Sequence, residues 1–364
     1  MYKKKLVIDV HGHLSAPPHF RAYAMNLMSL RSASSTLAIP ETAMAAAQER
    51  HLAMLDNCKV DLQLLSPRPV TMMHWERPFL VDKWTQTTND LIATQCKLHP
   101  KRFVGIAQLP QTTYRGIESC LPELTRCIRD LGFVGAIVNP DPGGNRMTPG
   151  MNDEYWFPLY EKAEELDATL IVHPSVSRDP RLEIIPHSYQ YNNLTEETLA
   201  TQLLERSDVF TRFPRLRVVV CHCGGALRRL LDHGGVMDAL ATEHGRDSRV
   251  LPSGQEAGSQ MGPGFGSVRK AKPNLSNNLF FDTCAYDSIF LGAAIRQHGS
   301  NRMVFGTEVP GTGSGVLNPE TGKPSDDVLA ILQKLEFLDD DDIVKMVHDN
   351  PRKVFPLLEK VYFS

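Results

Sequence analysis

The feature that most constrains the fold is a recurring short apolar, β-branched run that stops each time at a polar residue or a turn signal. The eight runs are Leu6 to His11, Val60 to Ser66, Phe103 to Pro110, Phe133 to Asn139, Ala168 to His173, Arg217 to His222, Leu279 to Thr283 and Arg302 to Glu308. Helical patterns lie between them, for example Glu41 to Asn57, Val81 to Leu98, Ile117 to Leu131, Tyr155 to Leu166, Glu196 to Phe210 and Ser288 to His298. Near-continuous apolar strands that alternate with helices indicate a parallel sheet covered on both faces.

The number of runs favours a closed (β/α)₈ barrel over an open doubly wound sheet. No Gly-x-Gly-x-x-Gly motif follows the first run, which weakens the dinucleotide-binding alternative. We therefore predict an α/β protein, a TIM barrel formed by a single domain over residues 1–364. Two long excursions, 14–40 and 244–278, follow strands on the side where barrels carry active sites. We interpret them as a substrate cover, although residues 244–278 could equally be a solvated insertion.

Composition points to a small-molecule ligand. The 39 basic and 42 acidic residues are well mixed, so no charged footprint suggests nucleic acid or an anionic membrane as a partner. No apolar run approaches the roughly 20 residues of a membrane span, and the basic start has too short an apolar run to be a signal peptide. The seven cysteines are odd in number and scattered, which favours reduced thiols and a cytoplasmic location.

Polar residues with metal-binding side chains stand at four of the predicted strand ends. His11 and His13 are two residues apart, so both imidazoles should project from the same face of the first strand. The fifth, sixth and eighth runs end at His173, His222 and Glu308. Any one of these histidines could be structural, but the carboxyl ends of barrel strands converge on one mouth. Together they predict a metal site.

Several motifs give these positions a family likeness. They are Asp9-Val10-His11-Gly12-His13, Ser66-Pro67-Arg68, Asn139-Pro140-Asp141-Pro142-Gly143-Gly144, His222-Cys223-Gly224-Gly225-Ala226, Phe281-Asp282-Thr283-Cys284 and Phe305-Gly306-Thr307-Glu308. With them, nearly the whole chain resembles the decarboxylase and hydratase branch of the amidohydrolase superfamily, and within it the 4-oxalomesaconate hydratases. Most of the superfamily has an aspartate where this chain, like those hydratases, has Glu308.

The resemblance implies a distorted (β/α)₈ barrel with long loops over the C-terminal mouth and one divalent metal, usually zinc. It also implies the metal ligands His11, His13, His173 and Glu308. Neutral imidazoles and a carboxylate suit Zn²⁺, leave one position open and lower the pKa of bound water to about 7. Manganese is the alternative to zinc.

His222 is predicted to act as general acid or base, or to bond the metal-bound water, with a purely orienting role as the alternative. Glu308 is the other candidate to move a proton. Cys221 and Cys223 flank His222, and we expect both to face away from it and to pack in the barrel wall.

A substrate with several carboxylates needs cations near the mouth. Arg68, at the end of the second run, could grip a carboxylate with its planar fork, or could form a salt bridge on the rim. Asn139 could touch substrate, or could cap the tight turn that follows it.

The loop after His173 is rich in hydrogen-bond donors. The resemblance implies a tyrosine near the reacting centre in this loop, and Tyr191, Tyr189 or an asparagine could stand there. We take Tyr191 as the catalytic candidate and Asn192 and Asn193 as substrate-binding candidates.

The leading functional hypothesis is a metal-dependent lyase. It would hydrate an unsaturated oxo-dicarboxylic or oxo-tricarboxylic acid from aromatic-compound breakdown, 4-oxalomesaconate or an analogue. The alternatives are a nonoxidative decarboxylase of an aromatic or muconate-type acid, a lactone or amide hydrolase, and a catalytically silent scaffold. The expected partner is a small anionic substrate, and a homodimer is an open expectation.

Overall fold

The strands form one parallel sheet in the order β1 to β8. The computed structural model describes residues 1–364 except 31–36, 38, 186–187 and 227–277. The strands are β1 (Ile8–His13), β2 (Leu62–Ser66), β3 (Phe103–Ala107), β4 (Gly135–Val138), β5 (Thr169–Val172), β6 (Val218–Val220), β7 (Leu279–Asp282) and β8 (Met303–Val304). Each strand lies within or next to one of the eight predicted runs, and every strand residue is buried.

Backbone hydrogen bonds between β1 and the segment after β8 bring the two edges of the sheet together. The Val10 N–H donates to the Phe305 carbonyl over 2.8 Å, and the Glu308 N–H donates to the His11 carbonyl over 2.6 Å. The prediction of a (β/α)₈ barrel is therefore confirmed, and one of the closing bonds joins two residues of the predicted metal group.

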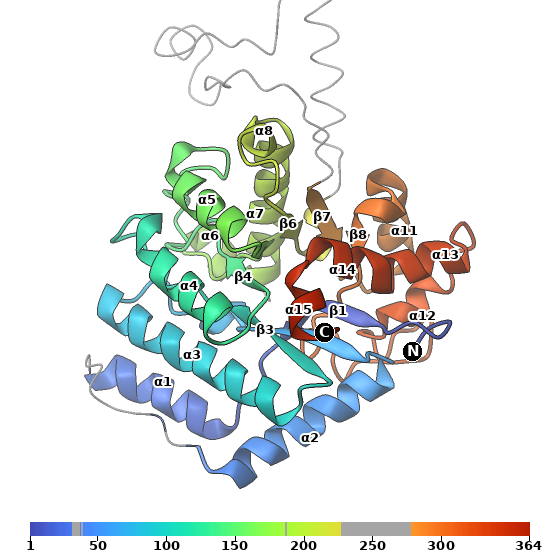
Figure 1. The fold of residues 1–364 in the computed structure, drawn as a ribbon, viewed down its shortest axis with the longest axis horizontal. Helices are drawn as coiled ribbons and strands as arrows, with labels where there is room; N and C mark the ends of the chain where they lie inside the picture. Colours follow the sequence, from blue (N-terminus) through green and yellow to red (C-terminus); the bar gives the residue numbers. More distant parts are fainter. Residues whose placement is uncertain (31–36, 38, 186–187, 227–277) are drawn as a thin grey trace, which may run out of the picture.

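Helices surround the barrel (Figure 1). The α-helices are α1 (Pro18–Leu30), α2 (Glu41–Asn57), α3 (Pro78–Leu98), α4 (Leu121–Arg129), α5 (Phe157–Glu165), α6 (Pro180–Glu183), α7 (Ser188–Glu205), α8 (Val209–Arg212), α11 (Ser288–His298), α12 (Val328–Leu332), α13 (Asp340–Val344), α14 (Asn350–Val354) and α15 (Leu357–Val361). Short 3₁₀ helices are η1 (Pro69–Thr71), η2 (Ile117–Cys120), η3 (Glu154–Trp156), η4 (His222–Gly224) and η5 (Ser300–Arg302), and η6 (Lys345–Asp349) is a π-helical turn. The bounds of α2 and α11 agree with the sequence prediction, whereas the pattern at 196–210 belongs to a helix that begins at Ser188 and to the separate α8.

Two apolar layers hold the barrel. The inner layer contains at least one side chain from every strand, such as Ile8 and Ile171, and the outer layer packs the strands against the helices. Residues from α14, α15 and the link between them join the inner layer and close one end of the barrel. These residues are Val354, Phe355, Leu357 and Leu358. The Thr169 hydroxyl donates to the Val354 carbonyl over 2.5 Å, which fixes this closing segment to β5.

A bulge in β1 changes which side chains face the barrel interior. Asp9 pairs with Gln63 and Gly12 pairs with Leu65, so β1 has one residue more than β2 between these pairs. Ile8 and Val10 lie in the inner apolar layer. In a regular strand, His11 and His13 would then face the opposite side, away from the barrel interior. The bulge lets His11 and His13 also turn to the mouth, beyond the apolar interior.

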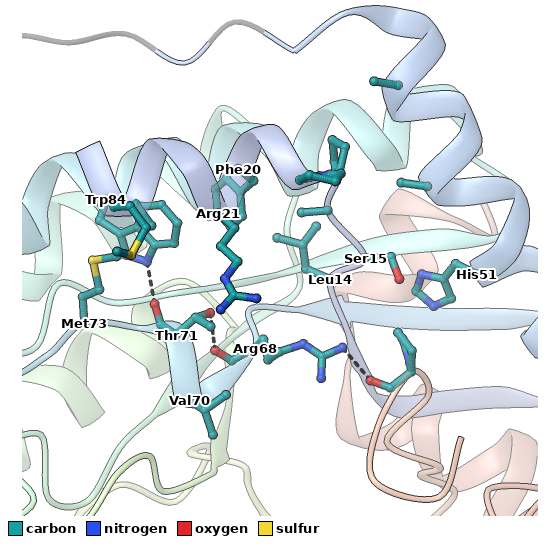
Figure 2. Close-up of a pocket in the computed structure, with 18 of the residues that line it drawn as sticks. Leu14, Ser15, Phe20, Arg21, His51, Arg68, Val70, Thr71, Met73 and Trp84 are labelled. Atoms are coloured by element: carbon teal, nitrogen blue, oxygen red, sulfur yellow. Dashed lines mark hydrogen bonds between the residues drawn. The ribbon is translucent and has the colours of Figure 1, made fainter. Parts of the chain in front are cut away.

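The excursion at 14–40, predicted as a long loop, contains the helix α1. Phe20, Tyr23, Ala24 and Leu27 are buried at helical spacing, and Phe20 stacks on Trp84 of α3 at a ring-centroid distance of 4.3 Å. The helix and its flanks line a cavity of about 1190 Å³ next to η1 (Figure 2). Almost all of the second excursion, 244–278, lies outside the described residues.

Among the described helices, none is long and apolar enough to cross a membrane. Each of the seven cysteines is a free thiol.

Candidate metal centre

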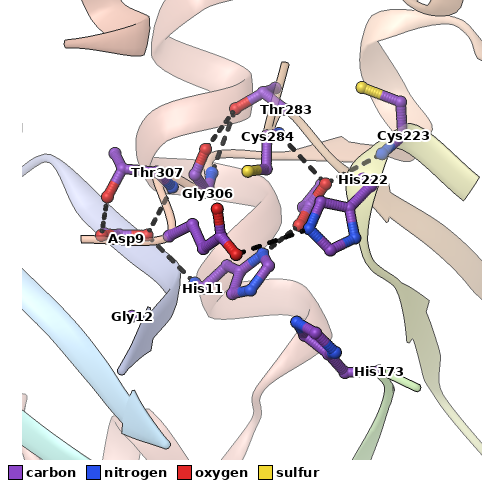
Figure 3. Close-up of polar contacts among 12 residues, drawn as sticks. Asp9, His11, Gly12, His173, His222, Cys223, Thr283, Cys284, Gly306 and Thr307 are labelled. Carbon is purple, nitrogen blue, oxygen red and sulfur yellow. Dashed lines mark hydrogen bonds and ion pairs between the residues drawn. The ribbon is translucent and has the colours of Figure 1, made fainter. Parts of the chain in front are cut away.

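Four side chains from the ends of β1 and β5 and from the segment after β8 converge at the barrel mouth. One ligand atom each from His11, His13, His173 and Glu308 lies within 4.8 Å of the other three. The imidazole rings meet edge to face, with ring centroids of His11 and His173 5.1 Å apart, and Figure 3 shows these two rings side by side. The structure thus brings together all four residues of the predicted ligand set.

The Nδ1 atoms of the β1 histidines are held by acceptors. His11 Nδ1 lies 2.6 Å from Asp282 Oδ2, at the end of β7. His13 Nδ1 lies 3.1 Å from the hydroxyl of Ser66, which itself donates to the Gly12 carbonyl over 2.8 Å. Because that hydroxyl proton is already used, Ser66 accepts from His13. Each ring therefore carries its proton on Nδ1 and offers the lone pair of Nε2.

His173 follows the same rule. Its Nδ1 donates to the Pro174 carbonyl over 2.8 Å. The Nε2 atoms of His11 and His173 are buried and have no hydrogen-bond partner among the described residues. Buried nitrogens with free lone pairs that point at a carboxylate fit a divalent metal of the zinc type.

Burial keeps the rings of His13 and His173 neutral. It lowers the pKa of His13 and His173 well below the usual 6.5, and the neighbouring His11 adds to the effect on both. Burial alone would raise the pKa of Glu308, but the nearby His222 outweighs it and holds that pKa well below its usual value. At neutral pH His13 and His173 are therefore neutral imidazoles and Glu308 is a carboxylate.

Glu308 reaches the centre from a left-handed backbone conformation, with φ of 65°. Its Oε1 lies 4.0 Å from His13 Nε2 and 3.8 Å from His222 Nε2. Its Oε2 accepts a hydrogen bond from the hydroxyl of Tyr286 over 2.5 Å. Only Oε1 is therefore turned toward the imidazoles.

His222 is the fourth imidazole at the mouth and has a carboxylate behind it. Its Nδ1 lies 2.7 Å from Glu197 Oε1, on α7, while Nε2 faces Glu308. Burial alone would lower the pKa of His222, but the charge and hydrogen bond of Glu197 raise it well above its usual value. His222 therefore holds a proton next to the candidate metal group.

The backbone conformation at His222 differs from that of a regular strand. His222 and Cys223 have φ of 48° and 59°, so strand alternation stops there. Cys221 packs in the inner layer and Cys223 in the outer layer, both fully buried. The expectation that both cysteines pack was correct, but the expectation that they share a side was wrong.

Arg68 lines the cavity of Figure 2. Its guanidinium donates to the Pro310 carbonyl over 2.8 Å, and its charge helps to lower the pKa of His13. The cavity is lined mostly by apolar side chains, together with Arg21, Arg50 and His51. A ligand anchored on Arg68 would have room there.

The other predicted substrate contacts are used within the protein. Asn139 is buried, and its side chain accepts from the Asp141 N–H over 3.1 Å and contacts His74 at 3.2 Å, which is the turn-capping alternative. Asn192 donates to the Ser175 carbonyl over 3.2 Å.

Tyr191 and Asn193 are not brought into the group either. The Tyr191 side chain is 55% exposed on α7 and makes no hydrogen bond with the metal group among the described residues. Asn193 is buried, and its Oδ1 has no partner there.

Sequence reasoning missed Asp282, Glu197 and Tyr286. Asp282 stands at the end of a predicted strand, so its position could have suggested a role beside His11. Glu197 and Tyr286 carry no such signal, because one lies inside a helix and the other in a loop after β7.

The comparisons with known proteins agree with this geometry. A family model described as amidohydrolase matches residues 8–357, and the chain belongs to this family. Over 362 residues, covering 97% of both chains, it is 30% identical to the 2-keto-4-carboxy-3-hexenedioate hydratase of Sphingobium sp. strain SYK-6.

Two solved structures extend the likeness. The 4-oxalomesaconate hydratase of Rhodopseudomonas palustris superposes with a TM-score of 0.77 at 25% identity, covering 98% of this chain and 97% of that one. A dihydroxybenzoic acid decarboxylase from Polaromonas sp. JS666 with bound manganese superposes with a TM-score of 0.64 at 19% identity over the full length of both chains, and shows the shared fold. The predicted resemblance to the decarboxylase and hydratase branch is confirmed.

Proposed function

We propose that this chain is a metal-dependent hydratase that adds water across the carbon–carbon double bond of an unsaturated oxo-acid with several carboxylates. Substrates of the 2-keto-4-carboxy-3-hexenedioate or 4-oxalomesaconate type are our choice, because the hydratases of these two compounds resemble the chain over nearly its whole length. The observation that carries the proposal is the convergence of three Nδ1-held histidines and Glu308 at the mouth.

The proposed metal ligands are His11, His13, His173 and Glu308. A divalent metal bound there would supply Lewis-acid chemistry, polarising substrate oxygens and lowering the pKa of a bound water to about 7. Zinc is our first choice on ligand chemistry, and manganese is the alternative that the decarboxylase of similar fold contains.

The protein's own groups supply binding and proton transfer in this proposal. Protonated His222 donates a proton from Nε2 to the substrate, and Glu308 is the second group able to move a proton. Arg68 anchors a carboxylate remote from the reacting bond, with the cavity behind it for the rest of the molecule.

The test is product mass after incubation of metal-loaded protein with 4-oxalomesaconate and 2-keto-4-carboxy-3-hexenedioate. A gain of about 18 mass units, one water, supports the hydratase. Loss of carbon dioxide would assign the chain to the decarboxylases of the same fold instead.

Metal dependence is tested on the same reaction. We expect chelation to abolish turnover, and one equivalent of Zn²⁺ or Mn²⁺ to restore it. His173→Asn should lose metal binding, measured by elemental analysis after gel filtration. Full activity of the chelated protein would refute the metal mechanism.

The compartment and the oligomeric state are two further proposals. The free thiols support a reducing compartment such as the cytoplasm. A homodimer is tested by sedimentation equilibrium.

A further inference from the structure

Tyr286 is the tyrosine in contact with the candidate metal group. Its hydroxyl donates a hydrogen bond to Glu308 Oε2 over 2.5 Å. Tyr191, in the loop that the resemblance points to, is 55% exposed instead. Tyr286 comes from the loop after β7.

The ring of Tyr286 is fixed by its surroundings. A Cβ at Gly313 would lie 2.9 Å from Tyr286 Cε1 and 3.1 Å from Cζ, so only a glycine lets the loop after β8 approach the ring so closely. The Tyr286 carbonyl accepts from Asn318 Nδ2 over 2.8 Å. Two residues before it, Cys284 donates its N–H to the carboxylate of Asp282, the residue that also holds His11.

Oε1 of Glu308 faces its neighbours over longer distances, 4.0 Å to His13 Nε2 and 3.8 Å to His222 Nε2. The backbone N–H of Glu308 is fixed by the His11 carbonyl over 2.6 Å. Gly311 lies beside it, where a Cβ would come within 2.7 Å of Glu308 Cγ and 3.0 Å of Cδ, so only a glycine lets the neighbouring loop pack this closely against the side chain. The hydroxyl of Tyr286 is the contact that decides which oxygen faces the imidazoles.

We propose that Tyr286 is a positioning residue that occupies Oε2 of Glu308 and so restricts this carboxylate to a single-oxygen contact with the metal. The inference rests on the metal group of the proposed function. A carboxylate bound through one oxygen leaves a coordination position for substrate, which two-oxygen binding would fill.

The test is Tyr286→Phe, which removes the hydroxyl and keeps the ring. With Co²⁺ as the probe metal, we expect the visible absorption band to lose intensity, because Oε2 is free to bind and the coordination number rises. In a competition with a chelator, we expect the affinity for Zn²⁺ to fall by roughly 10- to 100-fold, the usual effect of losing a group that orients a metal ligand.

Tyr114→Phe is the matched control, since Tyr114 is 65% exposed and has no contact with the metal group among the described residues. It should leave both readouts as in the parent protein. Asn318→Ala loosens the Tyr286 backbone without removing the phenol, and should shift the cobalt band in the same direction by less. It also serves as the test if Tyr286→Phe does not fold.

Two results would overturn the inference. One is a cobalt band and a Zn²⁺ affinity that Tyr286→Phe leaves unchanged. The other is an unchanged band with a lower melting temperature of the metal-free protein, which would make Tyr286 a fold-stabilising residue only. If the parent protein itself binds no metal, the proposed metal group fails, and that result is separate from both.

Discussion

At the scale of single residues, the proton on His222 depends on the buried carboxylate of Glu197. Glu197 is fully buried, and its Oε1 contacts Nδ1 of His222. A carboxylate at this distance favours the imidazolium, so the pKa of His222 is raised and the ring stays protonated as the pH rises past its usual value.

Glu197→Gln removes that charge, and the pKa of His222 should fall. Since the proposed donor is the protonated ring, we expect the alkaline decline of kcat/KM to begin at a lower pH, by about one pH unit or more. The measurement is the pH–rate profile. Glu196→Gln is the control, because Glu196 is also buried on α7 but pairs with Arg146 at 3.3 Å. Identical profiles for the two variants would remove His222 from the proton transfer.

Single residues also show where sequence reasoning succeeds and stops. His11, His13, His173 and Glu308 could be predicted as a group because the end of a barrel strand has a known position in space. Their partners could not, because Glu197 and Tyr286 reach the group across the fold, and no spacing in the chain encodes those contacts. The left-handed φ of Glu308, which aims its side chain, is equally invisible in the sequence.

At the scale of elements, the end of β6 is positioned by contact between η4 and α7. Gly225 has φ of 88°, and a Cβ there would lie 2.6 Å from the Thr198 nitrogen and 2.7 Å from the Leu194 carbonyl oxygen. Both obstacles are helix backbone, which cannot easily move. This close approach holds the His222 turn against the helix that carries Glu197.

Gly225→Ala should therefore lower the free energy of unfolding by about 3 kcal/mol, from strain at positive φ and the clash together. Gly132→Ala is the matched control, since Gly132 has φ of 71° but no atom within 4 Å of a Cβ, and should cost only about 1 kcal/mol. Urea denaturation of both variants measures the difference. Equal losses would mean that η4 and α7 adjust without cost.

Element boundaries were predictable where hydrophobic spacing was regular and were missed where tertiary contacts decided. The periodicity of α2 and α11 was sufficient to place both helices. The helix α1 was missed because its buried positions begin only after a Pro-rich stretch, which reads as a loop. The bulge in β1 and the turn at His222 break strand alternation, so the facing of Cys221 and Cys223 could not follow from counting residues.

At the scale of the whole molecule, two buried neutral histidines should make stability depend on pH. Burial lowers the pKa of His51 and of His74 to about 4. The unfolded chain binds protons at the usual pKa of 6.5, so it takes up more protons than the folded chain between pH 6.5 and about 4. Stability is therefore complete above pH 6.5 and is lost as the pH falls.

By pH 5 each ring should cost about 2 kcal/mol of unfolding free energy. His74→Gln removes one titrating ring, so the difference in stability between pH 7 and pH 5 should become smaller by that amount. Urea denaturation at the two pH values measures it. The exposed His19 provides the control variant His19→Gln, which should keep the parent difference. An unchanged difference in His74→Gln would show that other groups cause the acid sensitivity.

The segment of α14 and α15 that closes one end of the barrel is synthesised after all eight strands. Val354 to Leu358 complete an apolar interior that has contributions from all eight strands, yet a ribosome delivers them after every strand has emerged. Until then, inward-facing side chains such as Ile8 and Ile171 have no cover at that end of the barrel. We expect the nascent chain to remain incompletely folded through most of its translation and to depend on chaperones that shield apolar surface.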